Sequence, residues 1–349
     1  MTDPNPIRPN PPFTDMPRGN NNTAAGPLLS PPGDPRPFST VALMEYLGML
    51  AVLGALVGVF GLLTEHFLSA QNFMTIANQI PCATIIAVGM TFVLIIAGID
   101  LSVGSVLALG SVVLGVSMVQ YHIPLPLAVI GCLAVGLACG AINGLVTITW
   151  SLPSFIVTLG MLEIARGATY LVTPRTQYIG SAVQVVAETT LGGLSVTFLI
   201  ALMIVAAGQV VLSRSVFGRY MIAIGTNEEV VRLSGVDPRP IKLAVFTLCG
   251  FLAALAAVFD TSRTGSAVPN AGEGYELQAI AAVVIGGTSL MGGRGSVVRS
   301  FFGVLIIAVL GSGLAQIGAE DSTKRLITGC VIVAAVILDH YRQRLRKAA

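Results

Sequence analysis

Charged residues are scarce in this sequence. Only 10% of its 349 residues are Asp, Glu, Lys or Arg, whereas 54% are hydrophobic. A soluble globular domain carries roughly 25% charged residues, so the composition excludes an ordinary soluble domain. Apolar stretches of about 20 residues follow one another along the chain, and each has the length that crosses the hydrocarbon core of a bilayer. The composition therefore predicts an all-α integral membrane protein.

Catalytic and metal-binding motifs are also missing from the sequence. It contains no GxSxG, HExxH or GxxxxGK[ST] pattern, so we expect no catalytic residues, no metal site, no cofactor and no ATP hydrolysis in this chain. The five cysteines lie in apolar stretches without a CxxC pair, which is typical of small buried hydrophobic side chains. The net charge of +2 gives no indication of nucleic acid as a partner.

The first 40 residues differ in composition from the rest of the chain. They hold most of the 19 prolines, the run Asn20–Asn22 and no apolar period. Such a segment buries too little apolar surface to fold, so residues 1–40 are expected to be a disordered cytoplasmic tail. No short apolar region with a cleavage site precedes the first span, so no signal peptide is expected. Residues 41–340 form the membrane domain, and 341–349 form a basic cytoplasmic tail.

About ten apolar segments are expected to span the membrane. They are 41–63, 80–97, 105–119, 125–149, 155–173, 194–212, 241–259, 277–291, 297–316 and 326–339. Lys and Arg concentrate on the cytoplasmic side of membrane proteins. Most of the 19 Lys and Arg residues lie in the two tails, in residues 214–242 and beside the ninth span. An even number of spans before residue 214 places all of them on one side, which predicts that both termini are cytoplasmic.

The segment Gly218–Lys242 is the longest polar interruption between apolar segments. Thr226 or Asn227 can cap a short helix whose first turn is acidic, where the positive end of the helix favours carboxylates. Gly235 can end that helix. A folded helix here would offer its surface to a partner; a solvated connector without a partner is the alternative.

Glycine-rich turns interrupt two apolar stretches, at Ala97–Ser105 and Ile285–Ser296. Irregular backbone at membrane depth is tolerated only where it is buried in protein or lines a cavity, and transporters often break helices at matching places in two halves. Asp100 is the one acidic residue close to the middle of an apolar stretch, and it is either the N-cap of the next span or a functional carboxylate. Asn143 is either a pathway residue or a hydrogen-bonding contact between helices.

Four segments together carry a resemblance to a known family. They are AGIDLSVGSVLAL, AINGLVTITWSLPSFIVTLGMLEIARGATYLVT, FGRYMIAIGTNEEVVRLSGVDPRPIKLAVF and ELQAIAAVVIGGTSLMGGRGSV. Over residues 41–340 the chain resembles the permease subunit of bacterial ABC importers for monosaccharides, the ribose/xylose/arabinose/galactoside permease family. The resemblance implies an inner-membrane protein that pairs with a second permease subunit, identical or different. It also implies a cytoplasmic ATP-binding cassette protein, which binds ATP and Mg²⁺, and a periplasmic sugar-binding protein.

The same resemblance makes the central polar segment the coupling helix, which docks on the ATPase. ABC permeases often show E-A-A-x-x-x-G there; Glu229 and Gly235 match that spacing, whereas Val230 and Val231 replace the alanines. The residues expected to couple to the ATPase are Gly218, Arg219, Gly225, Asn227, Glu228, Glu229, Arg232 and Gly235. The candidate residues of the sugar pathway, which offer hydrogen-bonding groups and an aromatic face, are Asp100, Ser102, Asn143 and Phe155.

A proton- or sodium-coupled secondary sugar transporter, or a facilitator, is the alternative function. It would need an ion relay, and proton-coupled carriers usually hold several buried acids, whereas Asp100 stands alone here. An intramembrane enzyme is disfavoured by the missing motifs.

Overall fold

The computed structural model describes residues 40–320, 322–324, 326–331, 333–334 and 337. The chain divides into two compact units, Met1–Met44 and Glu45–Ala349, and the helical bundle described below belongs to the second unit. The two expected tails, 1–40 and 341–349, lie outside the described residues, except that Thr40 is the first residue of a helix.

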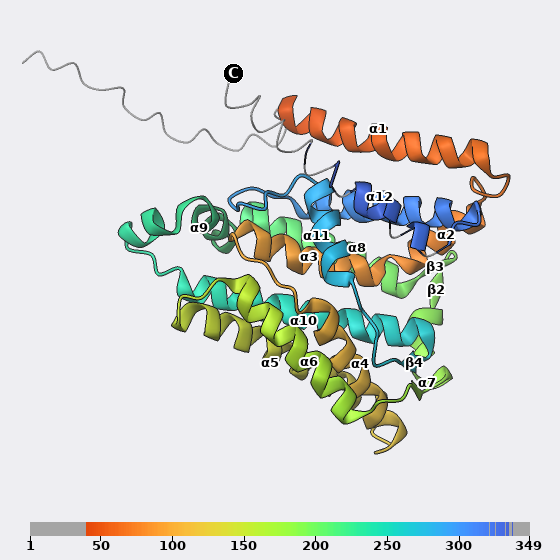
Figure 1. Ribbon diagram of the computed structural model, residues 1–349, viewed down its shortest axis with the longest axis horizontal. Helices are drawn as coiled ribbons and strands as arrows, with labels where there is room; N and C mark the ends of the chain where they lie inside the picture. Colours follow the sequence, from red (N-terminus) through yellow and green to blue (C-terminus); the bar gives the residue numbers. More distant parts are fainter. Residues whose placement is uncertain (1–39, 321, 325, 332, 335–336, 338–349) are drawn as a thin grey trace, which may run out of the picture. The chain divides into compact units, whose positions relative to one another are not determined.

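Twelve helices are defined within the described chain (Figure 1). They are α1 (Thr40–Leu63), α2 (Ala70–Gln79), α3 (Pro81–Ile95), α4 (Val103–Val119), α5 (Leu125–Thr149), α6 (Ser154–Val172), α7 (Ser181–Glu188), α8 (Val196–Arg214), α9 (Val216–Leu233), α10 (Arg239–Thr264), α11 (Tyr275–Ile285) and α12 (Val297–Gln316). Two small antiparallel strand pairs join loops: β1 (Gln177–Tyr178) with β4 (Ser266–Ala267), and β2 (Thr190–Leu191) with β3 (Leu194–Ser195).

The expected all-α membrane fold is confirmed. Within the described residues, 6 helices are long and apolar enough to cross a membrane, and α2 and α3, which meet at 48°, count as a seventh if they form one broken span. The apolar helices α4 and α11 are shorter, so helix length does not by itself establish ten spans. The expected spans 125–149 and 297–316 coincide with α5 and α12. The tenth expected span, 326–339, lies partly outside the described residues, and those of its residues that are described are helical.

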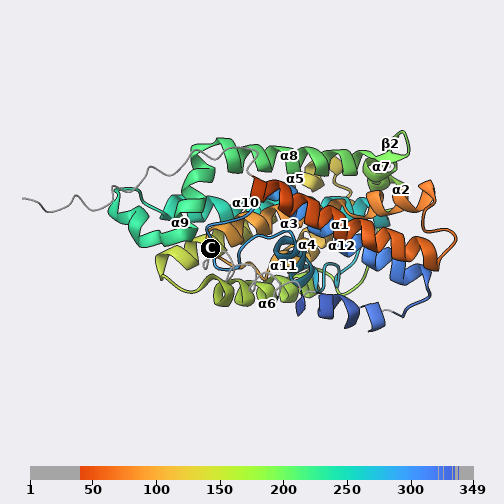
Figure 2. The same ribbon diagram turned by 90° about the horizontal axis from the view of Figure 1, so that it is seen from above.

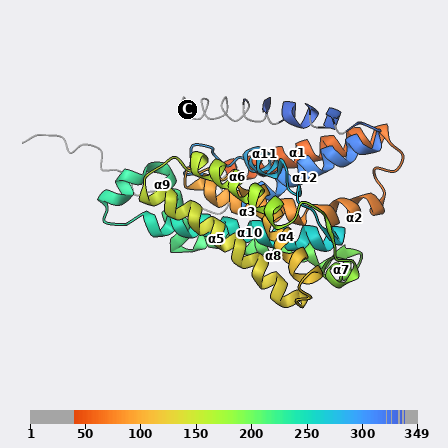
Figure 3. The ribbon, with the colours of Figure 1, turned by 60° about the horizontal axis from the view of Figure 1, so that its bottom comes forward.

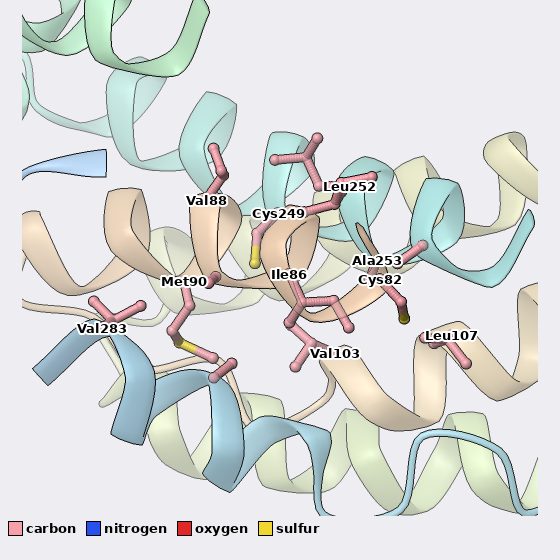
Figure 4. Close-up of a cluster of buried hydrophobic side chains, with 14 of the residues drawn as sticks. Cys82, Ile86, Val88, Met90, Val103, Leu107, Cys249, Leu252, Ala253 and Val283 are labelled. Carbon is pink, nitrogen blue, oxygen red and sulfur yellow. The ribbon is translucent and has the colours of Figure 1, made fainter. Parts of the chain in front are cut away.

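Helix α3 is the centre of the bundle and packs against α8, α10, α11 and α12 (Figure 1). All of its residues except Ala83 are buried, as expected of a helix that is apolar on every side. In Figure 4, Ile86 and Met90 of α3 lie between Cys249 of α10 and Val283 of α11. This layer of side chains holds the two halves of the chain together.

The cysteines test the expectation of small buried side chains. Four are free and buried, namely Cys82, Cys132, Cys139 and Cys249. The expectation is wrong for Cys330, which is exposed, because no described element covers that face of the helical segment after α12.

Helices α5 and α10 cross closely at glycines. A Cβ atom built on Gly250 of α10 would overlap the carbonyl oxygen of Gly136 and lie 2.8 Å from the Cα atom of Gly140, both on α5. Small residues let membrane helices approach at backbone distance. At this crossing α5 and α10 are therefore held together at backbone distance.

Replacing Gly250 with valine is expected to destabilise the protein, because the new side chain would meet the α5 backbone. Overpacking of this kind costs roughly 1–3 kcal/mol. The measurement is the Tm of the purified protein in detergent. Gly58→Val on α1 is the matched control, since a Cβ atom there meets nothing within 4 Å. Equal Tm values for the two variants would contradict the tight crossing.

Candidate functional site

Helix α9 carries the predicted coupling segment and lies at the end of the bundle where α5 ends and α10 begins; α7 and the strand pairs lie at the opposite end (Figure 1). The helix is interrupted at Asn227, whose backbone is non-helical (φ −162°, ψ 101°). The Asn227 Oδ1 atom accepts the backbone N–H of Val230 at 3.1 Å. The predicted capped short helix is therefore confirmed, with Asn227 rather than Thr226 as its cap.

Gly235 ends this short helix, as predicted. Its φ of 87° lies in the left-handed region, which glycine adopts without strain. Its N–H binds the carbonyl oxygen of Arg232 at 3.0 Å, and the N–H of Val236 binds that of Val231 at 3.3 Å. Such a turn satisfies carbonyl groups that the helix end would otherwise leave free, so the short helix is a defined element and not a flexible loop.

The outward face of the short helix mixes charge with apolar surface. Glu229 forms an ion pair with Arg232 at 2.6 Å, and both side chains are largely exposed. Exposed pairs of this kind contribute about 0–1 kcal/mol. Val230 and Leu233 are 59% and 78% exposed, whereas Val231 is buried. The short helix therefore presents two apolar side chains to its surroundings and uses a third to pack against the bundle.

A hollow of about 850 Å³ separates the short helix from the end of α5. Its lining includes Thr147, Leu152, Asn227 and Arg239. On the far side of the hollow, Lys242 of α10 forms an ion pair with Glu228 at 2.9 Å, which ties the short helix to the next span.

The first part of α9 touches both glycine-rich breaks. A Cβ atom built on Gly225 would overlap the carbonyl oxygen of Ile95, at the end of α3, and lie 2.5 Å from the backbone nitrogen of Gly293. The N–H of Gly293 in turn binds the Ile95 carbonyl oxygen at 2.9 Å. The two predicted breaks, which are far apart in the sequence, therefore meet each other and the coupling segment at one point.

Asp100 lies in the first break and is 1% exposed. Its Oδ1 atom accepts the N–H of Ser102 at 2.9 Å and the hydroxyl of Ser102 at 2.6 Å. Asn143 of α5 donates its Nδ2–H to the Ser102 Oγ atom at 3.0 Å. Three of the four predicted pathway residues are thus brought together, in a buried hydrogen-bond chain that joins the break to α5.

The N-cap interpretation of Asp100 is wrong by two residues. Ser102 is the N-cap residue of α4, because the helix begins at Val103. Asp100 instead holds Ser102 in place, and Asn143 serves as the contact between helices.

Two side chains of α6 complete the support of the first break. The Ser154 Oγ atom accepts the N–H of Ile99 at 2.9 Å. The Thr158 Oγ1 atom accepts the N–H of Leu101 and donates to the carbonyl oxygen of Ile99, each at 3.1 Å. A buried backbone group without a partner costs free energy, so these hydroxyls replace the helical bonds that the break lacks. The sequence did not predict them, because nothing in it pairs α6 with this turn.

The remaining predicted residues lie outside these contacts. Phe155 on α6 is 48% exposed and does not join the Asp100 network. At the start of α9, Gly218 is buried against the end of α8, and Arg219 is exposed.

The interpretation of Asp100 as the one acidic residue near the middle of an apolar stretch is also wrong. Glu163 lies at the midpoint of α6, and its side chain is exposed. Its position within the expected span 155–173 was a sufficient signal in the sequence. Only the structure shows that this carboxylate points away from the bundle.

Comparison with known proteins gives the family. The profile of a family described as "Branched-chain amino acid transport system / permease component" matches residues 72–336. The chain belongs to this family of permease components. It is a multi-pass membrane transport subunit and not an enzyme.

Curated relatives align over nearly their whole lengths. The ribose import permease protein RbsC of Escherichia coli (strain K12) is 37% identical over 321 residues, which cover 88% of this chain and 97% of the relative. RbsC of Haemophilus influenzae is 39% identical over 305 residues, covering 86% and 94%. The fructose import permease protein FrcC of Rhizobium meliloti is 35% identical over 311 residues, covering 86% of each. No solved structure matches the chain.

Replacing Thr158 with valine is expected to lower stability, because the substitution keeps the shape of the side chain and leaves the N–H of Leu101 unpaired. An unsatisfied buried donor costs roughly 1–3 kcal/mol. The check is thermal unfolding in detergent, with Thr158→Ser as the control because serine keeps the hydroxyl. If Thr158→Val unfolds at the same temperature as the unaltered protein, the first break does not depend on α6.

Proposed function

We propose that this protein is the permease subunit of an ATP-driven ABC importer that moves a monosaccharide, or a related polyol, into the cytoplasm. The observation that carries the proposal is the folded and capped short helix between α8 and α10, in a chain that is 37% identical to a ribose import permease over 321 residues. A solvated connector would not need an Asn cap, a glycine end and an ion pair to the next span.

The short helix is the proposed docking site for a cytoplasmic ATP-binding cassette protein. The centre of a protein–protein contact is more apolar than the polar rim that surrounds it. Val230 and Leu233 are the apolar centre here, and the Glu229–Arg232 pair lies beside them. The two valines that replace the usual alanines have separate roles, since Val230 faces outward and Val231 packs inward.

Force applied to the short helix would reach the membrane through α9. Gly225 contacts the backbone of both breaks, so a displacement of α9 cannot be absorbed by flexible side chains at that junction. ATP binding to the partner drives transport only if the partner contacts this segment differently in its two states. Alternating access would then follow from movement of α3 and α11, whose ends form the breaks.

The other components follow from the same proposal. A second permease subunit, identical or different, completes the pathway, and a periplasmic sugar-binding protein delivers the cargo at the end that bears α7 and the strand pairs. The protein lies in the bacterial inner membrane with both termini in the cytoplasm. The ATPase binds ATP and Mg²⁺. The residues of this chain that serve the cargo are proposed to include Phe155, whereas Asp100, Ser102 and Asn143 shape the break beside it.

The experiment that tests the proposal is purification of the protein from detergent-solubilised native membranes, followed by mass spectrometry. Recovery of a Walker-motif ATPase in near-equal amount supports an ABC importer. Recovery of this chain alone, with uptake of ribose in ATP-free vesicles, would establish the secondary transporter instead.

Replacing Leu233 with aspartate is expected to reduce recovery of the ATPase roughly tenfold or more, because an unpaired carboxylate buried in an apolar contact is costly and each 1.4 kcal/mol changes the affinity about tenfold. Leu191→Asp is the matched control: Leu191 is 71% exposed, close to the 78% of Leu233, but it lies in β2 at the opposite end of the bundle. Both variants should insert into the membrane normally. Equal ATPase recovery from the two variants would contradict the docking role of the short helix.

A further inference from the structure

The exposed carboxylate of Glu163 conflicts with a position on the lipid-facing surface of the protein. Among the described residues, it is the only Asp or Glu in the middle third of a helix long enough to span the membrane. At 1.5 Å per residue it lies roughly 13 Å from either end of α6, which is close to the midplane of a hydrocarbon core about 30 Å thick. Acidic side chains at that depth almost always face protein or a water-filled cavity.

Nothing within the described chain satisfies this side chain. It makes no hydrogen bond and no ion pair with any described residue, although Arg166 lies one turn further along α6. The Arg166 guanidinium is instead held by the carbonyl oxygens of Pro269 and Ala271, at 2.9 and 3.2 Å. Within the described chain α6 packs against α4 and α5, and Figures 2 and 3 show it on the outside of the bundle. Its outer face is therefore not covered by the described part of the chain.

The surroundings of Glu163 on α6 have the features of a carbohydrate site. Helical spacing places Ile156, Gly160, Gly167 and Tyr170 on the same face. A Cβ atom at either glycine would meet no atom within 4 Å, so the face is open on both sides of the carboxylate. Tyr170 is 45% exposed and offers an aromatic surface with a hydroxyl. A carboxylate between open space and an aromatic ring can accept hydrogen bonds from two neighbouring sugar hydroxyls.

A dry contact with a second permease subunit fits this face less well. In an identical pair the same surface of both subunits meets at the two-fold axis. A Glu163 carboxylate close to that axis would face its copy in the partner subunit, and the two would repel in a medium of low dielectric constant. Water between the subunits removes that repulsion, and a water-filled gap at the subunit interface is a pathway.

We propose that Glu163 lines the translocation pathway at the interface of the two permease subunits and binds the hydroxyl groups of the passing sugar. The assignment rests on the proposed function, because that function supplies both the sugar and the second subunit. It moves the centre of the pathway from the buried Asp100 network to the open face of α6.

Thiol labelling tests whether water reaches this face. The exposed Cys330 is first replaced by serine, which leaves four buried cysteines. Glu163→Cys and Ile164→Cys are then compared in the assembled importer with a membrane-impermeant cationic thiol reagent. Ile164 is 65% exposed but points about 100° away from Glu163 around the helix. Because the thiolate is the reacting form and needs a polar environment, Glu163→Cys should react at least roughly tenfold faster.

Sugar protection and transport test the binding role. Ribose, fructose and allose, the sugars in the names of the curated relatives, are added as probes, and the one that is imported should slow labelling of Glu163→Cys. Glu163→Gln should raise the KM for that sugar severalfold. Ile164→Ala, which alters the neighbouring exposed side chain of α6 on a different side of the helix, should leave KM unchanged.

Three results would overturn the assignment. The first is slow labelling of Glu163→Cys at the same rate as Ile164→Cys. The second is a disulfide between two Glu163→Cys subunits that the reagent does not label. The third is a KM in Glu163→Gln equal to that of the unaltered protein. Loss of the proposed function has a different signature, because the Cys330→Ser parent would then show no ATP-dependent sugar uptake.

Discussion

The rest of the fold depends on one contact between the two halves of the chain, in which the N–H of Gly293 donates a hydrogen bond to the carbonyl oxygen of Ile95. It joins the two interrupted membrane segments, and Gly225 of α9 packs directly onto it. Gly225, Gly293 and Ile95 approach one another at backbone distance, which limits how far the junction can rearrange to absorb movement. A coupling segment seated there acts on both breaks at once, and Gly225 and Gly293 leave the room that this approach needs.

The same constraint extends to the outer face of α6. A break in a membrane helix leaves N–H and carbonyl groups without helical partners, and they must be satisfied within the protein. Ser154 and Thr158 do this for the first break. The coupling segment, the break and α6 are therefore connected by continuous contacts, and α6 carries Glu163 on its opposite, exposed face. Movement that begins at the short helix of α9 has a direct structural route to the face proposed to bind sugar.

Much of the fold could be predicted from local sequence patterns. The limits of α5 and α12, the cap and glycine end of the short helix, and both glycine-rich breaks depend on residues close together in the chain, and the structure agrees with them. The predictions failed where long-range packing decides. Asp100 supports the break and does not cap α4, Cys330 is exposed, and the polar helix α2 bends against α3 although its sequence gives no membrane-spanning signal.

The sequence by itself determined the membrane class, the order of the helices and the chemistry of the polar segment Gly218–Lys242, because hydrophobic length, caps and turns are local properties. Only the tertiary structure decided which polar groups face one another and which face outward. Asp100 and Glu163 are both acidic residues in apolar surroundings, and hydropathy treats them alike. Packing buries the first in hydrogen bonds to Ser102 and leaves the second exposed at mid-membrane depth, because burial depends on neighbours that the linear chain places far away.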